Sequence, residues 1–283
     1  MAINWYPGHI AKAEKKLKEQ VKLVDVIIEV LDARIPESSS YDNLDYLLGD
    51  KPRLLLLNKS DVADPDFNSK WVDYLREKTG FNVIMTSAST GKDVSSVIKE
   101  AVKLGEPVME KLKAKGLLPR PVRVMVVGMP NVGKSSIINK LIKTAKVKVG
   151  ARAGVTRAAQ WIRIHPKLEL MDTPGIIPMK IPTQERAVKL AMVNSVGEAS
   201  YDKAEVANSL IELAFERYPQ MFCNYYKVDS NNQPTLEEIA LSRNLLLTGG
   251  TPDTERCATL ILTDFRQGRA GRMTLEDTPQ IED

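Results

Sequence analysis

The chain has few cysteines and no long apolar run, and each shortage excludes a class of protein. Cys223 and Cys257 are the two cysteines among 283 residues. They are too few for a disulfide scaffold or a zinc site, so we expect reduced thiols in a cytoplasmic protein. No window approaches about 18 uninterrupted apolar residues, so no membrane-spanning helix is predicted. The leading MAINWYPGHIAKAEKK lacks the apolar core of a signal peptide, and we expect neither a signal nor a transit peptide.

The composition is that of a globular protein with unevenly distributed charge. The chain is 43% hydrophobic and 27% charged, with 16 glycines and 16 prolines, and its length favours two domains over one large one. Residues 1–183 carry 30 Lys and Arg against 20 Asp and Glu, whereas residues 184–283 carry 10 against 16. The basic front part favours a polyanionic partner, nucleic acid before membrane, because no lipidation signal or amphipathic anchor occurs. Lysine-rich helices that only solvate themselves explain the charge equally well.

Apolar runs alternate with amphipathic stretches through the first part of the chain. VDVIIEVLDA (24–33) is a continuous apolar run that ends in an acidic residue, which is typical of a buried parallel strand. Further strands are expected at 53–61, 81–89, 123–130, 159–165 and 168–175. Helices are expected at 9–22, 41–49, 66–79, 92–105, 106–115 and 135–143, with a connector at 115–123. The alternation predicts an α/β fold with a mostly parallel sheet and helices on both faces.

The pattern changes after Pro182. Segments such as KAEVANSLIELAFERY and DTERCATLILTDFRQG place apolar residues at helical spacing and show no strand-like alternation. We therefore expect one α/β domain over residues 1–182 and a small all-helical domain over residues 183–283. The acidic tail 274–283 is expected to fray. The aromatic residues Phe222, Tyr225 and Tyr226 are expected to pack the helical core, with base stacking as the alternative.

The segment GMPNVGKS (128–135) follows an apolar strand and opens a helix. Glycines let successive backbone amides turn towards phosphate groups, and the helix N-terminus adds the positive end of its dipole. Lys134 can reach the β- and γ-phosphates, and the Ser135 hydroxyl can bind Mg²⁺. The pattern predicts a phosphate-binding loop, whose binding residues are Pro130, Asn131, Val132, Gly133, Lys134 and Ser135.

A second turn, DTPG (172–175), ends the strand expected at 168–175. An aspartate at this place can hold Mg²⁺ through a water molecule, and the amide of the glycine can meet the γ-phosphate. Turns of this composition are common by themselves, but this one follows two strands beyond the phosphate-binding loop. Asp172 and Gly175 are therefore predicted to complete the phosphate and metal site.

Polar residues also end the strands expected at 53–61 and 81–89. In NKSD (58–61) the Asp61 carboxylate can accept two hydrogen bonds from the N1 and N2 groups of guanine, a donor pair that adenine lacks. Asn58 can link the base edge to the phosphate-binding loop, the Lys59 stem can pack on the ring, and a backbone N–H at the next strand end can donate to guanine O6. The predicted base-binding residues are Asn58, Lys59, Ser60, Asp61, Thr86, Ser87 and Ala88.

NKSD, TSAS, GMPNVGKS, GVT (154–156) and DTPG resemble the five signature loops of the Ras-like GTPases. In that family the phosphate-binding loop comes first, whereas here the base-binding loops precede it, so a circularly permuted P-loop GTPase fold is expected. With a leading WYPGH (5–9), a DAR (32–34) and a helical tail, the chain resembles the YlqF-type permuted family of ribosome biogenesis GTPases over nearly its whole length. The resemblance implies GTP/GDP and Mg²⁺ as ligands. It also implies a monomeric cytoplasmic factor with the large (50S) ribosomal subunit precursor as partner and no membrane.

The resemblance implies further roles near the γ-phosphate. Thr156 is the implied second protein ligand of Mg²⁺, and Asn131 is implied to bind K⁺, a cation that would do the work of an arginine finger; a plain structural amide is the alternative. Ile176 stands where a water-orienting glutamine is usual, and an aliphatic side chain cannot orient water, so slow basal hydrolysis is expected. His9 is then a candidate, with a helix cap or ribosome contact as alternatives. The expected catalytic residues are His9, Lys134 and Thr156.

The chain leaves for the helical domain only a few residues after Gly175. Loss of the γ-phosphate is therefore expected to move that domain's attachment point, unless the domain is a passive lid. Asp32 and Arg34 are expected either to pin the N-terminal segment to the nucleotide face or to form an ordinary ion pair. His165 is expected to lie exposed in a hairpin turn. The predicted rRNA contacts, made through phosphates, are the helix Lys12–Lys22 and Arg266, Arg269 and Arg272.

A nucleotide-gated RNA-binding module in which hydrolysis is incidental remains an alternative function. A GTPase acting in tRNA modification or at membranes is a further alternative, which no methyltransferase motif, zinc cluster or anchor in the sequence supports.

Overall fold

The computed structural model describes residues 8–41, 44–144, 161–172, 175–176 and 183–280. Within these residues there is one seven-stranded sheet, in which six strands lie in the order β3-β2-β1-β4-β6-β5. The seventh strand, β7, pairs with the carboxyl end of β4, whereas β6 pairs with its amino end. β5 and β6 are antiparallel, and the other pairs are parallel, which confirms the predicted α/β fold. The strands are β1 (Val26–Asp32), β2 (Arg53–Asn58), β3 (Asn82–Met85), β4 (Val122–Gly128), β5 (Trp161–His165), β6 (Leu168–Met171) and β7 (Gly175–Ile176).

Helices cover both faces of this sheet. Leu55 and Leu57 of β2 pack in one apolar cluster with Trp71 of α3, whereas Leu54 and Leu56 belong to the cluster that contains α4 and α5. Alternate residues of a strand point to opposite faces, so α3 lies on one face and α4 and α5 on the other. The described helices are α1 (Gly8–Val21), α2 (Leu44–Leu48), α3 (Pro65–Thr79), α4 (Val94–Ala114), α5 (Lys134–Thr144), α6 (Gln184–Met192), η1 (Glu198–Ser200), α7 (Lys203–Arg217), α8 (Pro219–Tyr226), α9 (Leu236–Ser242) and α10 (Thr254–Gln267).

The carboxyl ends of adjacent strands bring distant parts of the chain together. β1 ends at Asp32, β2 at Asn58 and β4 at Gly128, and Asp32 pairs in register with Asn58. In open α/β sheets ligands bind at this edge. The predicted base-binding and phosphate-binding loops therefore start from the same edge of one sheet.

The two helices predicted at 92–105 and 106–115 are one continuous helix, α4, which passes through Pro107. Its buried stripe includes Val97, Ala101 and Gly105, and a Cβ at Gly105 would lie 2.4 Å from the Val122 side chain. Pro107 is exposed. Packing of the stripe against the sheet keeps the helix intact, although proline removes one backbone hydrogen bond.

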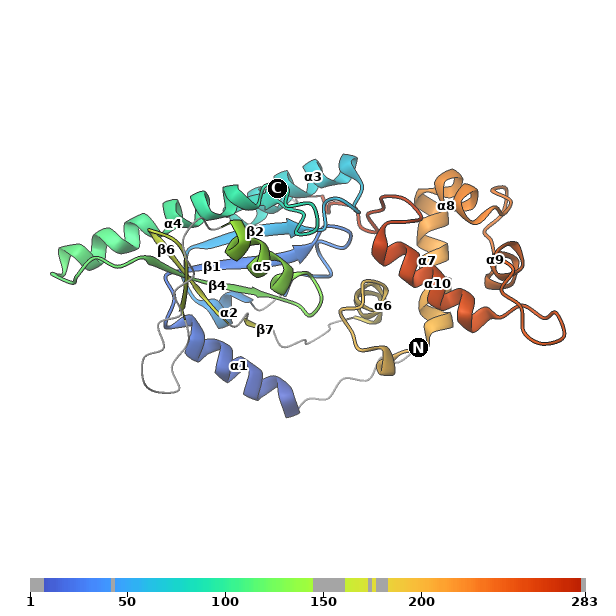
Figure 1. Cartoon of the computed structure of the whole chain (residues 1–283), viewed down its shortest axis with the longest axis horizontal. Coiled ribbons are helices and arrows are strands. Elements are labelled where there is room, and N and C mark those ends of the chain that lie inside the picture. The colour runs from blue at the N-terminus through green and yellow to red at the C-terminus, as the bar shows by residue number, and fades with distance from the viewer. Residues whose placement is uncertain (1–7, 42–43, 145–160, 173–174, 177–182, 281–283) are drawn as a thin grey trace.

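Helices α6 to α10 gather at one end of the molecule (Figure 1). Phe222 and Tyr226 are buried among them, as expected of core residues, and Tyr225 is half-buried beside the Arg243 guanidinium. Cys223 and Cys257 are buried free thiols. None of the described helices is long and apolar enough to cross a membrane.

The prediction that the acidic tail frays is wrong for residues 274–277, which make tertiary contacts. From α10 the chain returns to the sheet beside α3 (Figure 1), and we call residues 271–277 the strap. Thr274 is 0% exposed and Glu276 is 5% exposed. The Trp71 indole of α3 donates to the Glu276 carbonyl at 3.2 Å, and the Glu276 carboxylate accepts from the backbone N–H of Glu37 at 2.8 Å. These tertiary contacts outweigh the polar composition that predicted a solvated tail.

Candidate functional site

The phosphate-binding loop needs its glycines for two separate reasons. Gly128 has φ 153° and Gly133 has φ 104°, both in the region that favours glycine. A Cβ at Gly128 would lie 2.5 Å from the Val30 carbonyl oxygen, and one at Gly133 would lie 2.1 Å from Nδ2 of Asn58. The loop can therefore lie close against the end of β1 and the base-binding loop only because no side chain intervenes.

Lys134 occupies the first position of α5 and is 7% exposed. Its ammonium donates to the Met129 carbonyl within the same loop. Burial lowers the pKa of Lys134 to about 8. An anionic phosphate beside it would favour the charged form, so the side chain is suited to bind and neutralise a phosphate group.

Asn58 joins the three predicted nucleotide loops. Its Nδ2 donates to the Val132 carbonyl at 2.9 Å, and its Oδ1 accepts from the Ala88 amide at 3.1 Å and from Oγ1 of Thr86 at 3.4 Å. The Ala88 amide, one of the amides of the turn predicted to meet guanine O6, is thus directed at Asn58. Of the predicted link between the base edge and the phosphate-binding loop, the part from Asn58 to the loop is present as a direct hydrogen bond.

A buried charge cluster lies beneath the base-binding loop. Asp32, 0% exposed, accepts from Nε and Nη2 of Arg34 at 2.9 and 2.8 Å and from Nζ of Lys59 at 2.8 Å. Burial alone would raise the pKa of Asp32, but the two cations hold it far below its usual value. Arg34 also donates to the carbonyls of Phe265 and Arg266 at the end of α10, at 3.3 Å each. The pair is therefore a buried ion pair that reaches the C-terminal helix.

Lys59 extends from this cluster to the phosphate-binding loop, where its Nζ donates to the Asn131 carbonyl at 2.8 Å. Burial lowers the pKa of Lys59, and the Asp32 carboxylate opposes that effect. Its backbone has φ 63°, in the left-handed region. The base-binding loop thus begins with a strained turn that a charge pair and a backbone contact hold in place.

Asp61, the predicted guanine acceptor, is partly exposed and accepts from the Ser89 hydroxyl at 2.6 Å. Partial burial acts to raise the pKa of Asp61, but hydrogen bonds from Ser89 and Ser87 leave it below its ordinary value, with a smaller effect from the Arg272 charge. A carboxylate that stays ionised at neutral pH is the acceptor that the N1 and N2 groups of guanine require.

Two of the three arginines predicted to contact rRNA donate hydrogen bonds to backbone carbonyls of the fold. Arg266 donates to the carbonyls of Ala191 and Met192 at the end of α6, at 3.0 Å each. Arg272 donates to the carbonyls of Ser60 and Ala63 in the base-binding loop, at 2.8 Å each. These contacts give both arginines a role within the fold, and their predicted contact with rRNA stays a prediction. Arg269, with its side chain 55% exposed, pairs with Asp264 at 3.4 Å.

The turn after α6 contacts the phosphate-binding loop. Nδ2 of Asn131 donates to the Asn194 carbonyl at 2.5 Å, and the Ser195 hydroxyl donates to the Pro130 carbonyl at 2.7 Å. The sequence offered no signal for this contact, since neither residue belongs to a recognised motif. A segment beyond the predicted domain boundary therefore touches the loop that would hold the phosphates.

The residues present suit the predicted metal ions in chemical type. Ser135 is the second residue of α5, and the exposed Asp172 follows β6, the neighbour of β4. Hydroxyl and carboxylate oxygens are the ligands that Mg²⁺ prefers. The bond from Nδ2 of Asn131 to Asn194 turns its Oδ1 away from that residue, and an amide oxygen suits K⁺. Among the described residues no group of three or more His, Cys, Asp and Glu could hold a metal alone, so phosphate oxygens and water would complete the coordination.

Several predicted residues on the γ-phosphate side lie outside the described part. Thr156 and the GVT segment lie there, as does the side chain of His9, whose backbone begins α1. Gly175 and Ile176 form β7, which pairs with Val127 and Gly128 of β4. Gly175, the last residue of the DTPG segment, therefore lies beside the strand that leads into the phosphate-binding loop. His165, predicted to be exposed, is half-buried, and its Nδ1 accepts from the Lys167 amide in the β5–β6 turn.

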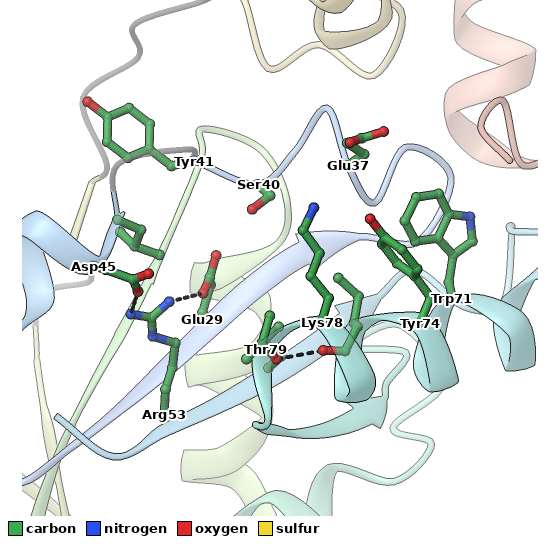
Figure 2. A pocket seen from close by; sticks show the side chains of 13 residues that line it. Glu29, Glu37, Ser40, Tyr41, Asp45, Arg53, Trp71, Tyr74, Lys78 and Thr79 are labelled. Atoms are coloured by element: carbon green, nitrogen blue, oxygen red, sulfur yellow. Dashed lines mark hydrogen bonds and ion pairs between the residues drawn. The ribbon is translucent and has the colours of Figure 1, made fainter. Parts of the chain in front are cut away.

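A pocket of about 290 Å³ lies on the α3 face of the sheet, beside the short helix α2. Figure 2 shows the Glu29 carboxylate within it, joined by Arg53 to Asp45; the two ion pairs measure 3.3 and 2.6 Å. Burial raises the pKa of Glu29 to about 7, against the opposing charge of Arg53. Glu37 and Ser40 of the loop after β1 also line the pocket.

That loop is held from two sides. The Glu276 carboxylate of the strap accepts from the amides of Glu37 and Ser38, and Arg186 of α6 donates to the carbonyls of Glu37, Ser38 and Ser40. The sequence alone did not indicate either contact. The pocket therefore lies where the strap and α6 meet the sheet domain.

Comparison with known proteins gives concordant matches. Residues 123–233 match the family model described as 50S ribosome-binding GTPase. The ribosome biogenesis GTPase A of Bacillus cereus is 37% identical over 291 residues, covering 100% of this chain and 98% of the relative. That of Thermotoga maritima is 36% identical, covering 99% and 96%. Mitochondrial ribosome-associated GTPase 1 of Mus musculus is 33% identical, covering 96% and 90%.

The fold is similar to solved structures of the same kind. The crystal structure of GNP-bound YlqF from T. maritima superposes with a TM-score of 0.66 at 31% identity, covering 95% of this chain and 100% of the other. The GDP-bound YlqF structure gives a TM-score of 0.65. The order in which base-binding strands precede the phosphate-binding strand agrees with these structures and confirms the predicted permutation.

Proposed function

We propose, because this chain belongs to the ribosome biogenesis GTPase A family, that it acts on the maturing large ribosomal subunit and that this particle stimulates its hydrolysis of GTP. GTP binding and hydrolysis themselves follow from the family and from the matched GTPase model. Hydrolysis would time release of the protein from the particle, and the protein would act as a monomer in the cytoplasm, where subunits are assembled.

The observation that supports the nucleotide-binding part of the proposal is that Asn58 joins three predicted nucleotide loops. It connects the guanine-reading segment, the Thr86–Ala88 turn and the phosphate-binding loop through hydrogen bonds of 2.9 to 3.4 Å. Beside it the Asp61 carboxylate is held ionised. This is an arrangement for reading guanine and its phosphates in one rigid unit. We infer that the residues predicted from these motifs bind the nucleotide.

Ser135, Thr156 and Asp172 would hold Mg²⁺, with Asp172 acting through water, and the ion would offset the charge that develops on the phosphates. Lys134 would bind the β- and γ-phosphates directly, because its ammonium already lies inside the loop. Asn131 would present its Oδ1 to K⁺. These assignments rest on the motif positions and on the geometry of the loop.

We place the division between the GTPase domain and the particle-binding domain at residues 182 and 183. Helices α6 to α10 follow that point; α7 to α10 gather away from the sheet, and α6 lies between them and the sheet (Figure 1). For contact with rRNA we favour α1, whose Lys12, Lys15 and Lys16 are exposed while Leu17 is buried. Exposed lysines on one helix bind phosphates without reading sequence.

Single-turnover hydrolysis of GTP with and without large-subunit precursor particles tests the proposal. A particle-stimulated rate is expected, because Ile176 cannot orient the attacking water. An unchanged rate at a particle concentration that saturates binding would instead support a nucleotide-gated RNA-binding module, in which hydrolysis is incidental.

His9→Ala is the first prediction. If His9 orients water, its loss acts in the transition state and not in binding. GTP affinity and particle binding should stay near those of the wild type, while turnover at saturating particle falls at least about tenfold, since acid–base assistance is typically 10²–10⁴-fold. His165→Ala, in the β5–β6 turn, is the matched control. Wild-type turnover of His9→Ala at saturating particle would exclude a catalytic role for His9.

A further inference from the structure

The strap holds the base-binding loop from the side opposite the Thr86–Ala88 turn. Nη2 and Nε of Arg272 donate to the carbonyls of Ser60 and Ala63, at 2.8 Å each. These two carbonyls flank Asp61 in sequence. On the other side, the Ser60 amide donates to the Thr86 carbonyl at 3.1 Å. The turn that carries Asp61 therefore lies between two hydrogen-bonded supports.

Backbone contacts extend this support along the chain. The Met273 amide donates to the Val62 carbonyl at 3.2 Å, and the Leu275 amide donates to the Arg34 carbonyl at 2.8 Å. The Gly268 turn lies against the same loop, since a Cβ at Gly268 would lie 2.6 Å from the Val62 side chain. The end of α10 and the strap thus contact Val62, next to the base-binding loop, and then Arg34, just after β1.

We propose that Arg272 is a positioning residue for guanine, and that the strap transmits occupancy of the base site to the helical domain whether or not a γ-phosphate is present. The inference rests on the proposed role of Asp61 as the guanine acceptor. Arg272 acts through the backbone on both sides of that carboxylate and fixes the direction in which it points. Two charge-assisted hydrogen bonds at a fixed spacing match the planar guanidinium, which a lysine ammonium cannot copy.

This route differs from the one predicted through the chain that leads from Gly175 to the helical domain. Gly175 and Ile176 pair with Val127 and Gly128 at the start of the phosphate-binding loop, and the chain that follows them is predicted to distinguish GTP from GDP. The strap contacts no residue of the described phosphate-binding loop in any of these hydrogen bonds, and both nucleotides carry the same base. The strap would therefore distinguish a loaded site from an empty one.

Equilibrium binding of GDP and IDP to the full chain tests the positioning role. Inosine lacks the N2 amino group, so the ratio of the two affinities reports how well Asp61 is aimed. Arg272→Ala should weaken GDP binding about tenfold or more and lower the GDP-to-IDP ratio, whereas kcat at saturating GTP stays within about twofold. Arg272→Lys should recover only part of the ratio. Arg269→Ala, which removes a nearby arginine that pairs with Asp264 and not with the base-binding loop, is the control.

A GDP-to-IDP ratio in Arg272→Ala equal to that of Arg269→Ala would overturn the positioning role. Asp61→Asn separates this failure from that of the base site itself. If Asp61→Asn binds GDP as the wild type does, the base-loop assignment fails; if it loses GDP while Arg272→Ala keeps the wild-type ratio, only the role of Arg272 fails.

Hydrogen exchange of the wild-type chain tests the transmission without any substitution. The Met273 and Leu275 amides should exchange more slowly with GDP than without nucleotide, and equally slowly with a non-hydrolysable GTP analogue. Exchange that GDP leaves unchanged, or that only the triphosphate analogue slows, would overturn the proposal.

Discussion

The C-terminal part of the chain meets the nucleotide loops at two places that differ in burial. On the base side, Asp32, Arg34 and Thr274 are each 0% exposed and join the strap, α10 and the base-binding loop. On the phosphate side, Asn131 and Ser195 make one exposed and one half-buried hydrogen bond to backbone carbonyls. Breaking a buried, charged contact costs more than breaking an exposed neutral one. We therefore expect the base side to be the more stable attachment and the phosphate side to be the one that differs between the GTP and GDP states.

The largest effect is expected from Asp61→Asn on the base side. The amide presents a donor to guanine N2, and the resulting mismatch should weaken GTP binding by about 100-fold or more. Xanthine nucleotides should bind better than to the wild type, because their C2 carbonyl accepts from that amide. Titration with GTP and XTP measures both effects, with the exposed Asp73→Asn on α3 as control. Unchanged GTP affinity would contradict the base-side assignment.

Next in size is the pH dependence that Glu29, in the pocket between α2 and α3, gives to the stability of the fold. Burial raises the pKa of Glu29 from 4.5 to about 7. Between these values the folded state holds a proton that the unfolded state has lost, so stability falls as pH rises through the window and levels off above it. Relative to Glu29→Gln, the wild type should lose up to about 3 kcal/mol between pH 4.5 and 7.

Urea unfolding of both proteins at several pH values measures this difference, and groups common to both cancel. Glu37→Gln, at an exposed position of the same pocket, is the control and should retain the wild-type slope. A constant difference in the free energy of unfolding between the wild type and Glu29→Gln at all pH values would show that Glu29 does not titrate in this range.

On the phosphate side, hydrolysis should be severalfold faster in KCl than in NaCl at equal ionic strength. The hydrogen bond to Asn194 orients the Asn131 amide so that its oxygen can bind the larger cation. Asn131→Gly keeps the left-handed backbone that this position needs, φ 56°, and should abolish the preference. Equal rates of the wild type in the two salts would leave Asn131 as a structural residue.

The smallest effect is expected from Ser195→Ala. It removes one neutral hydrogen bond, to the Pro130 carbonyl, worth about 1 kcal/mol. GDP affinity should change by less than about fivefold, while hydrogen exchange in the turn after α6 becomes faster. Ser209→Ala on α7, which removes a bond to the Glu205 carbonyl within one helix, is the control. A loss of GDP affinity as large as that of Arg272→Ala would contradict the expectation that the phosphate-side contact is the weaker of the two.

The sequence predicted the elements better than it predicted the contacts between them. Continuous apolar runs at β1 and β2 correspond to strands that are buried throughout, and the GMPNVGKS, NKSD and TSAS turns lie at one edge of the sheet. These features are local, because hydrophobic runs and turn residues act within a few positions of the chain. The prediction of two helices on either side of residues 105 and 106 failed because a tertiary contact, the packing of α4 against the sheet, outweighs the local helix-breaking effect of Pro107.

The arginines show what a local pattern leaves open. Arg266 and Arg272 stand in a basic segment that is typical of nucleic-acid contacts, yet both donate to backbone carbonyls about 75 and 210 residues away in the chain. A guanidinium binds a carbonyl, a carboxylate or a phosphate with similar geometry. Which of these partners an arginine binds depends on which groups the tertiary fold leaves unpaired, and the spacing of residues in the sequence does not predict that.

The position of the strap near the end of the chain determines when the base-binding loop is supported during synthesis. Ser60 and Ala63 are synthesised early, whereas Arg272, which holds their carbonyls, is added some 210 residues later. At about 5–20 residues per second, the growing chain waits roughly 10 to 40 s for that support. The guanine-reading turn of a nascent chain is therefore held on one side only. With Arg272 positioning guanine as proposed, full selectivity is reached only when translation is nearly finished, and we expect an incomplete product to compete poorly with finished molecules for GTP.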